Sequence, residues 1–172
     1  MEPGQDWKVA ALTFNIYVHF FYVGDIMDEF YMQEALKEAK KAFNCGEVPI
    51  GAIIVENNKI ITRAHNTKDN NNCAIFHAEI NAIKEASKMK NNWRLNDCIM
   101  YVTLFPCPMC ASAINQSRMC KVIYGAMSDN ANYELVDKIL NDKNYGNPVE
   151  ITGGILEEEC SKILKEFFLK KR

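Results

Sequence analysis

Two short motifs supply the side chains around which this chain has to fold. The first, at positions 76–79, reads Phe-His-Ala-Glu, and the second, at positions 106–110, reads Pro-Cys-Pro-Met-Cys. They offer one imidazole and two thiols, and a metal held by three protein ligands keeps a fourth position open for water. We therefore predict that His77, Cys107 and Cys110 bind one zinc ion per chain in a catalytic rather than a structural site.

The spacing within each motif fits the start of a helix. Cys107 and Cys110 are three residues apart, so both can lie in the first turn of one helix, where Pro108 is tolerated. A second helix is expected over residues 78–89, whose apolar side chains recur along one face, namely Ile80, Ile83 and Ala86. Because helix side chains tilt toward the N-terminus, ligands at both helix starts can face one ion.

Glu79 is expected to act beside the metal without binding it. Bound zinc lowers the pKa of its water to about 7. The resulting hydroxide attacks a ring carbon that carries an amino group, while Glu79 moves the proton to a ring nitrogen and later to the leaving ammonia. His-x-Glu followed by Pro-Cys-x-x-Cys is the signature of zinc-dependent nucleobase deaminases.

Two other interpretations of the cysteines stay open. A closed structural zinc site would need a fourth ligand from Cys73, Cys98 or Cys120, and it would leave Glu79 without a role. A redox pair at positions 107 and 110 is expected in a thioredoxin-like setting, without a His-Glu companion.

From about Met27 to Arg172 the chain resembles bacterial tRNA adenosine deaminases of the cytidine-deaminase-like superfamily. Beyond the zinc motifs, the similar segments are EVPIGA at 47–52, WRL at 93–95, YVTL at 101–104, SR at 117–118, VIYGA at 122–126 and FF at 167–168. The resemblance implies a three-layer αβα fold, with a mixed five-stranded sheet and helices on both of its faces.

The resemblance also implies a function. Adenosine in tRNA, at the anticodon wobble position, would be hydrolysed to inosine by attack at C6, in a homodimer. It implies that Asn66 and Ala78 bind the substrate. Without the resemblance, an asparagine in the Asn-rich loop 66–73 is more often a turn residue.

Two departures from the family's pattern bear on the substrate. Phe105 stands where the family usually has glutamate, and residues 127–134 contain no glycine where the family has a glycine-rich loop beside the active site. One alternative is therefore a deaminase of a free nucleobase or nucleoside, of guanine, adenine or cytosine type. Another is a non-catalytic RNA-binding or partner subunit with a structural zinc.

Net charge and cysteine content bear on nucleic-acid binding and on the cellular location of the protein. The net charge of −2 gives no broad basic footprint for nucleic acid, so an RNA contact needs a local patch such as the basic end at 170–172. Seven cysteines, at least two of them assigned to metal, favour a reducing, cytoplasmic location over a disulfide scaffold.

Residues 1–26 are expected to be an N-terminal extension of unclear status, preceding a deaminase domain at 27–172. Their apolar, aromatic stretch at 9–23 is shorter than a membrane span. No membrane partner is expected, and a weak surface anchor is the alternative.

The remaining pattern predicts alternating strands and helices. Besides those at the two motifs, helices are expected at 28–43, 133–140 and 156–168. Strands are expected at 50–55, 59–64, 99–104, 121–125 and 149–152, with a hairpin turn at Asn57-Asn58 between the first two. Such alternation is typical of an α/β sheet covered by helices.

Overall fold

The computed structural model describes residues 26–171. The predicted extension at 1–26 lies outside the described residues except for its last position. Within 26–171, none of the helices has the length and apolar character needed to cross a membrane.

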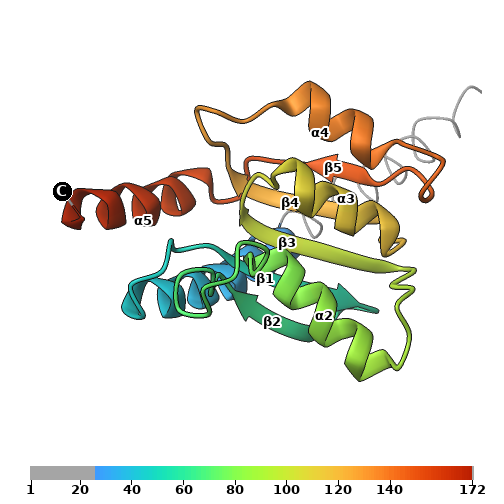
Figure 1. Ribbon diagram of the computed structural model, residues 1–172, viewed down its shortest axis with the longest axis horizontal. Helices are drawn as coiled ribbons and strands as arrows, with labels where there is room; N and C mark the ends of the chain where they lie inside the picture. The colour runs from blue at the N-terminus through green and yellow to red at the C-terminus, as the bar shows by residue number, and fades with distance from the viewer. Residues whose placement is uncertain (1–25, 172) are drawn as a thin grey trace, which may run out of the picture.

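Five strands form one mixed sheet in the order β2-β1-β3-β4-β5 (Figure 1). The strands are β1 (Gly51–Glu56), β2 (Lys59–His65), β3 (Cys98–Leu104), β4 (Lys121–Ala126) and β5 (Glu150–Thr152). Strand β1 pairs antiparallel with β2 and with β3, whereas β3, β4 and β5 run parallel. The predicted mixed five-stranded sheet is confirmed, and its strand bounds agree with the expected ones to within one residue.

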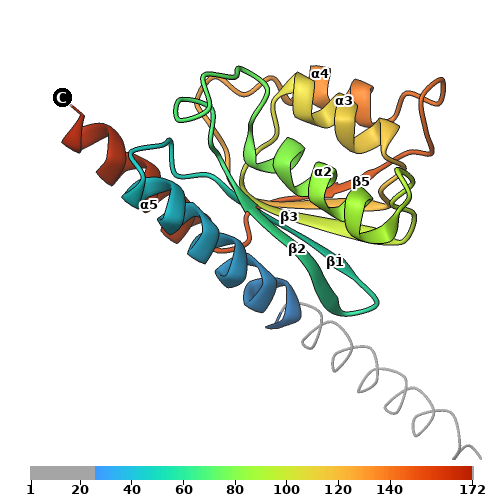
Figure 2. The same cartoon turned by 60° about the horizontal axis from the view of Figure 1, so that its bottom comes forward.

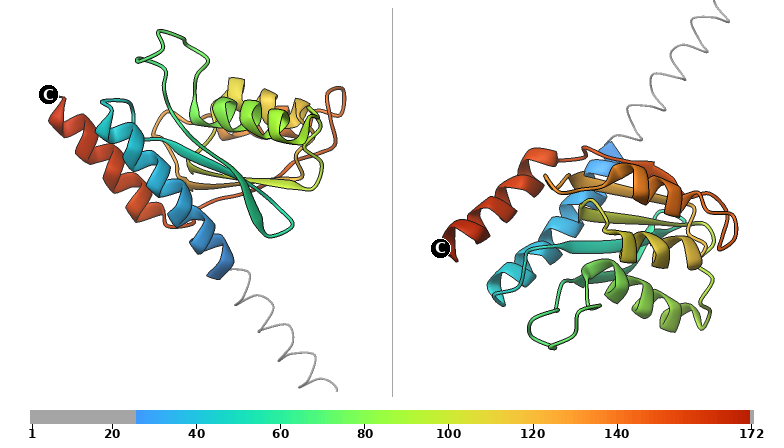
Figure 3. Two further views of the ribbon diagram at one scale, coloured as in Figure 1. Left: turned by 90° about the horizontal axis from the view of Figure 1, so that it is seen from below. Right: turned by 45° about the horizontal axis from the view of Figure 1, so that its top comes forward.

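Helices cover both faces of this sheet (Figures 2 and 3). The helix of residues 26–44 and α5 (Glu157–Lys170) lie on one face. The other face carries α2 (Ala78–Lys90), α3 (Pro108–Gln116) and α4 (Tyr133–Leu140). The three-layer αβα fold is therefore confirmed.

The sheet separates two apolar clusters. Along β1, Ala52 and Ile54 belong to the cluster under α2, α3 and α4, while Ile53 and Val55 belong to the cluster under the helix of residues 26–44 and α5. Alternate residues of a strand point to opposite faces, so a strand buried on both sides reads as a continuous apolar run. This explains the uninterrupted Ile-Ile-Val sequence of β1.

The predicted hairpin turn between β1 and β2 is also present. Asn57 and Asn58 both adopt positive φ, at 49° and 58°. Positive φ at both central positions is the geometry of the tight hairpin turn, and asparagine tolerates it better than most residues do.

The inward face of α2 includes Ala86, as the predicted stripe does, and Ile83 packs partly buried against the core. Its fully buried apolar residues are Ala78, Ala82 and Ala86, whereas Ile80 and Ile83 are only partly buried. Small side chains let a helix approach a sheet closely. Where two apolar stripes of a helix overlap, periodicity alone does not say which of them faces the sheet.

Gly51 marks another close approach, between β1 and the helix of residues 26–44. A Cβ atom there would lie 2.1 Å from the Ala35 carbonyl oxygen and 2.4 Å from the Ala39 nitrogen. Both are backbone atoms, so they cannot move aside as a flexible side chain can.

We expect Gly51→Ala to destabilise the fold by about 3 kcal/mol, because overpacking forces the helix off the sheet. Gly46→Ala is the matched control, since Gly46 has a φ of +77° but no atom within 4 Å of the added carbon. That control should cost only about 1 kcal/mol of backbone strain. Urea unfolding followed by circular dichroism measures both, and equal losses would contradict the close packing.

Candidate active site

Both motifs lie at helix starts on the same face of the sheet. His77 is the N-cap of α2 and Cys107 is the N-cap of α3, and both have an extended backbone. Neither side chain caps its own helix by a hydrogen bond, so both are available for other contacts. Cys107 thus precedes the first turn, in which it was predicted to lie, and Pro108 is the first helical residue.

Although Cys107 lies just before the first turn of α3, its thiol still lies beside that of Cys110. The side chains of an N-cap residue and of the residue three positions later meet at a helix start, as in the capping box. Cys107 and Cys110 occupy these two positions of α3.

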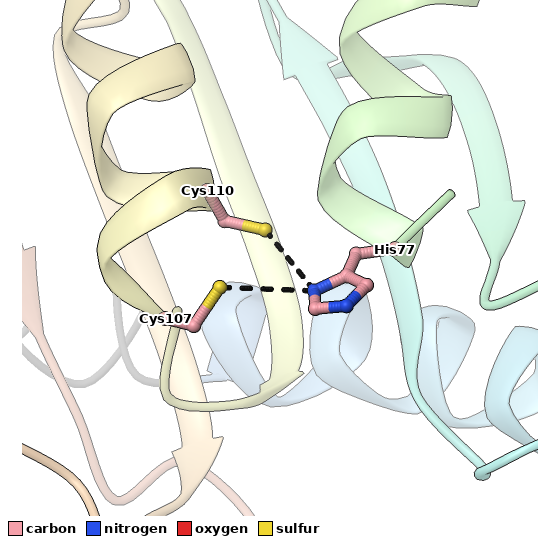
Figure 4. A group of neighbouring side chains, drawn as sticks. All are labelled: His77, Cys107 and Cys110. Carbon is pink, nitrogen blue, oxygen red and sulfur yellow. Dashed lines mark hydrogen bonds between the residues drawn. The ribbon is translucent and has the colours of Figure 1, made fainter. Parts of the chain in front are cut away.

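The three predicted ligands come together (Figure 4). His77 Nδ1 lies 3.7 Å from Cys107 Sγ and 3.5 Å from Cys110 Sγ. The three donor atoms all lie within 4.8 Å of one another, which makes them a group that could hold a metal ion. Within residues 26–171 no further histidine, cysteine or carboxylate belongs to this group. Cys73, Cys98 and Cys120, the alternatives for a fourth ligand, are therefore not part of it.

The cluster itself favours one thiolate. A hydrogen bond from Cys110, followed by one from His77, lowers the pKa of the Cys107 thiol to about 4, although burial opposes the change. The same contact with Cys107 raises the pKa of Cys110, and burial adds to the rise. Metals bind the thiolate form, which the contacts of the cluster favour at Cys107.

Glu79 is buried beside this cluster, at the second position of α2. The residue is 4% exposed, and its Oε2 atom has no hydrogen-bond partner among the described residues. Burial is the main cause that raises the pKa of its carboxyl group. Buried polar atoms are rarely left unpaired, and those that are commonly have a chemical role.

Asn66 and Ala78, the predicted substrate-binding residues, differ in their surroundings. Asn66 directly follows β2, is 3% exposed, and donates a hydrogen bond from Nδ2 to Glu47 Oε2 at 2.9 Å. Ala78 is fully buried and belongs to the apolar cluster under α2, α3 and α4. Only the backbone of Ala78 is therefore suited to contact a polar ligand.

Lys68 is a residue near the cluster that motif analysis missed. It is exposed in the loop between β2 and α2. The pKa of His77 is raised chiefly by the hydrogen bond with Cys107, and the positive charge of Lys68 acts against that rise. A single exposed lysine in a polar loop carries no local sequence signal.

Phe105, the residue at the family's glutamate position, packs into an aromatic cluster. It is 6% exposed, with its ring centroid 4.9 Å from that of Tyr124 and 5.8 Å from that of Tyr133. Tyr133 is the first residue of α4, which follows the glycine-free loop. The two departures noted in the sequence are therefore in contact, since Phe105 holds the start of α4.

Comparison with known proteins shows that the chain is similar to deaminases. A model of the MafB19-like deaminase family matches residues 26–172. The tRNA-specific adenosine deaminase of Bacillus subtilis strain 168 is 46% identical over 146 residues, which is 84% of this chain and 91% of the relative.

Two solved structures are also similar. One, from a study of A-to-I editing by tRNA:A34 deaminases at the wobble position, is 33% identical with a TM-score of 0.72, covering 78% of this chain and 99% of its own. The other, guanine deaminase from Bacillus subtilis, is 30% identical with a TM-score of 0.55, covering 69% of this chain and 71% of its own.

Metal content tests the cluster directly. We expect the purified chain to carry one transition-metal ion, and Cys110→Ala to reduce the occupancy to near zero because it removes a buried thiolate donor. Cys120→Ala is the matched control, since Cys120 is exposed and outside the group. Elemental analysis by mass spectrometry gives the occupancy of each variant. Full occupancy in Cys110→Ala, or loss in Cys120→Ala, would contradict the ligand set.

Proposed function

The chain belongs to the MafB19-like deaminase family, among the tRNA-specific adenosine deaminases, and from this we propose that it hydrolyses adenosine to inosine in tRNA, at the anticodon wobble position. The observation that carries the proposal is the cluster of His77, Cys107 and Cys110 with the unpartnered Oε2 atom of the buried Glu79 beside it. In the reaction, water adds its oxygen to C6, the bond from C6 to the amino nitrogen breaks, and ammonia leaves.

The donor set fits zinc. One imidazole and two thiolates are typical zinc ligands, with bond lengths of about 2.0–2.3 Å. A tetrahedral arrangement of such bonds separates a nitrogen donor from a sulfur donor by about 3.6 Å, and the two distances from His77 Nδ1 are 3.5 and 3.7 Å. When bound, zinc lowers the pKa of a coordinated water to about 7.

Glu79 moves the protons. Its free Oε2 accepts one proton of the attacking water and passes it to a ring nitrogen of the base. It then carries the second proton, from the hydroxyl group added at C6, to the leaving amino nitrogen. A group with this task needs a pKa near the working pH. The rise caused by burial brings the carboxyl group toward that range.

The start of α2 and the loop before it form the substrate pocket in this proposal. Asn66 contributes its side-chain amide and Ala78 its backbone N–H. Backbone N–H groups in the first turns of α2 and α3 would help to stabilise the negative charge that develops on the attacking oxygen. The homodimer and the cytoplasmic location complete the proposal on the resemblance alone.

Local positive charge supports an RNA substrate in spite of the net charge of −2. Lys68 lies close enough to the cluster to act on the pKa of His77, which is raised chiefly by Cys107. Lys170 and Lys171 end the chain's last helix. Phosphate contacts need only a few such side chains, and they position the RNA without reading its bases.

Deamination of free guanine is the second candidate. It is favoured by the 30% identity with guanine deaminase of Bacillus subtilis, together with Phe105 at the family's glutamate position. The identity of 46% over 84% of the chain with a tRNA-specific relative ranks the tRNA substrate first.

The substrate is decided by a release assay. We expect the metal-loaded protein to release ammonia and form inosine from an anticodon stem-loop with adenosine at the wobble position. Free adenosine, adenine, guanine and cytosine should release little, because they lack the phosphate contacts. Ammonia from guanine alone would overturn the proposal in favour of the second candidate.

Glu79→Gln tests the proton carrier. The variant should keep its metal and lose turnover by about 10²–10⁴-fold, the usual contribution of general acid–base catalysis. Glu85→Gln is a matched control on the same helix, where Glu85 is exposed and pairs with Lys88. Turnover and metal content are measured for both. Retained turnover in Glu79→Gln would remove this residue from the mechanism.

A further inference from the structure

Glu47 is a second buried carboxylate near the site, and neither the metal nor the proton transfers use it. It follows the helix of residues 26–44 and precedes β1. The residue is 0% exposed. In the sequence it opens the segment EVPIGA at 47–52, which is similar to the deaminase family.

The carboxylate of Glu47 binds the loop that leads from β2 to α2. Its Oε2 accepts from Asn66 Nδ2 at 2.9 Å and from the Asp69 backbone N–H at 3.2 Å. Its Oε1 accepts from the Asn70 backbone N–H at 2.6 Å. All three donors belong to the loop, and no lysine or arginine of the described residues forms an ion pair with Glu47.

A buried charge without an ion pair is a costly way to hold a loop. Hydrogen bonds to a carboxylate are stronger than those between neutral groups, but removing the charge from water costs several kcal/mol. A neutral side chain could anchor two backbone N–H groups at lower cost. Loop closure alone therefore does not explain why a carboxylate stands at position 47. The bond from the Asn66 side-chain amide suggests a further reason.

That reason is the orientation of Asn66. A carboxylate only accepts hydrogen bonds, whereas an asparagine amide has a donating and an accepting end. Contact with Glu47 therefore requires Nδ2 to point at the carboxylate and leaves Oδ1 on the other side. Among the described residues no hydrogen bond uses Oδ1, so it is available to a ligand as an acceptor.

A second set of hydrogen bonds, from Asn81, holds the two ends of the loop. Asn81 of α2 donates from Nδ2 to the His65 carbonyl at 2.9 Å, to Thr67 Oγ1 at 3.1 Å and to the Phe76 carbonyl at 3.4 Å. This ties the two ends of the loop together beside His77. Glu47 holds the outer part, on both sides of Lys68.

We propose that Glu47 is a positioning residue that sets the side-chain amide of Asn66, and the loop carrying Lys68, against the substrate. The role rests on the proposed function, since Asn66 is assigned there to the substrate pocket. With a neutral glutamine at position 47, both ends of the Asn66 amide find a partner, so the fixed choice of acceptor toward the substrate is lost.

A double-mutant cycle tests the proposal on the anticodon stem-loop. Glu47→Gln should lower kcat/KM about 10- to 100-fold, the usual cost of a misplaced substrate contact. In the Asn66→Ala background the same change should cost less than about threefold, because residues that act through one another are not additive. Equal losses in the two backgrounds would reduce Glu47 to a fold-stabilising residue. No loss in the single variant would also overturn the proposal.

Glu38→Gln is the matched control. Glu38 is also a buried glutamate, 3% exposed, but its partners are Lys41 at 2.6 Å and His65 at 3.3 Å. It makes no hydrogen bond to residues 66–76, so its loss should leave kcat/KM within about twofold, as expected for a site without a shared partner. Metal content is compared among the variants to exclude an effect through the ligands.

A measurement without substrate separates this proposal from the proposed function. In the intact protein the amides of Asp69 and Asn70 should be protected from hydrogen exchange, and the Asn66 side-chain amide should give one pair of sharp NMR signals. Glu47→Gln should speed the exchange at least about tenfold and shift or broaden that pair. Unchanged exchange and signals overturn the positioning role, whatever substrate is found. If Glu47→Gln does not fold, Glu47→Asp, which keeps the charge but shortens the reach, takes its place in both experiments.

Discussion

Both helix starts that carry the metal donors face the same edge of the sheet because two crossovers run in the same direction. Strand β1 is antiparallel to both β2 and β3, so β2 and β3 point the same way, and β4 is parallel to β3. The connections from β2 through α2 to β3 and from β3 through α3 to β4 must then start at one edge. Carboxyl ends of such strands are where open α/β sheets bind ligands.

Two buried glutamates near this edge differ in the hydrogen bonds of their carboxylates. Both oxygens of Glu47 accept hydrogen bonds, from three N–H donors in all, whereas Oε2 of Glu79 has no partner among the described residues. The bonded carboxylate of Glu47 therefore fits a role in holding the loop. The unpartnered oxygen of Glu79 fits a role in accepting a proton. Burial raises the cost of both arrangements, so neither is expected in a region with no task.

Local sequence pattern accounts for the elements and the ligand set but not for contacts across the fold. Apolar periodicity and the Asn57-Asn58 turn predict the strands to within one residue, and the motif spacing identifies His77, Cys107 and Cys110. The bond from Asn66 to Glu47 joins residues 19 positions apart on different elements, so no local pattern encodes it. Ala78 and Ala82, which share the buried face of α2 with Ala86, were missed for a related reason, since close approach depends on what lies opposite.

Each of His77, Cys107 and Cys110 lies at a helix start or just before it, and none of the three comes from the loop after β4. That loop, together with Phe105 and Tyr133 that hold the start of α4, can therefore vary in length and chemistry without dismantling the reaction centre. Such an arrangement lets substrate specificity change during evolution while the residues proposed for catalysis are kept. Divergence among deaminases of this fold would then be concentrated in a few replaceable rim segments.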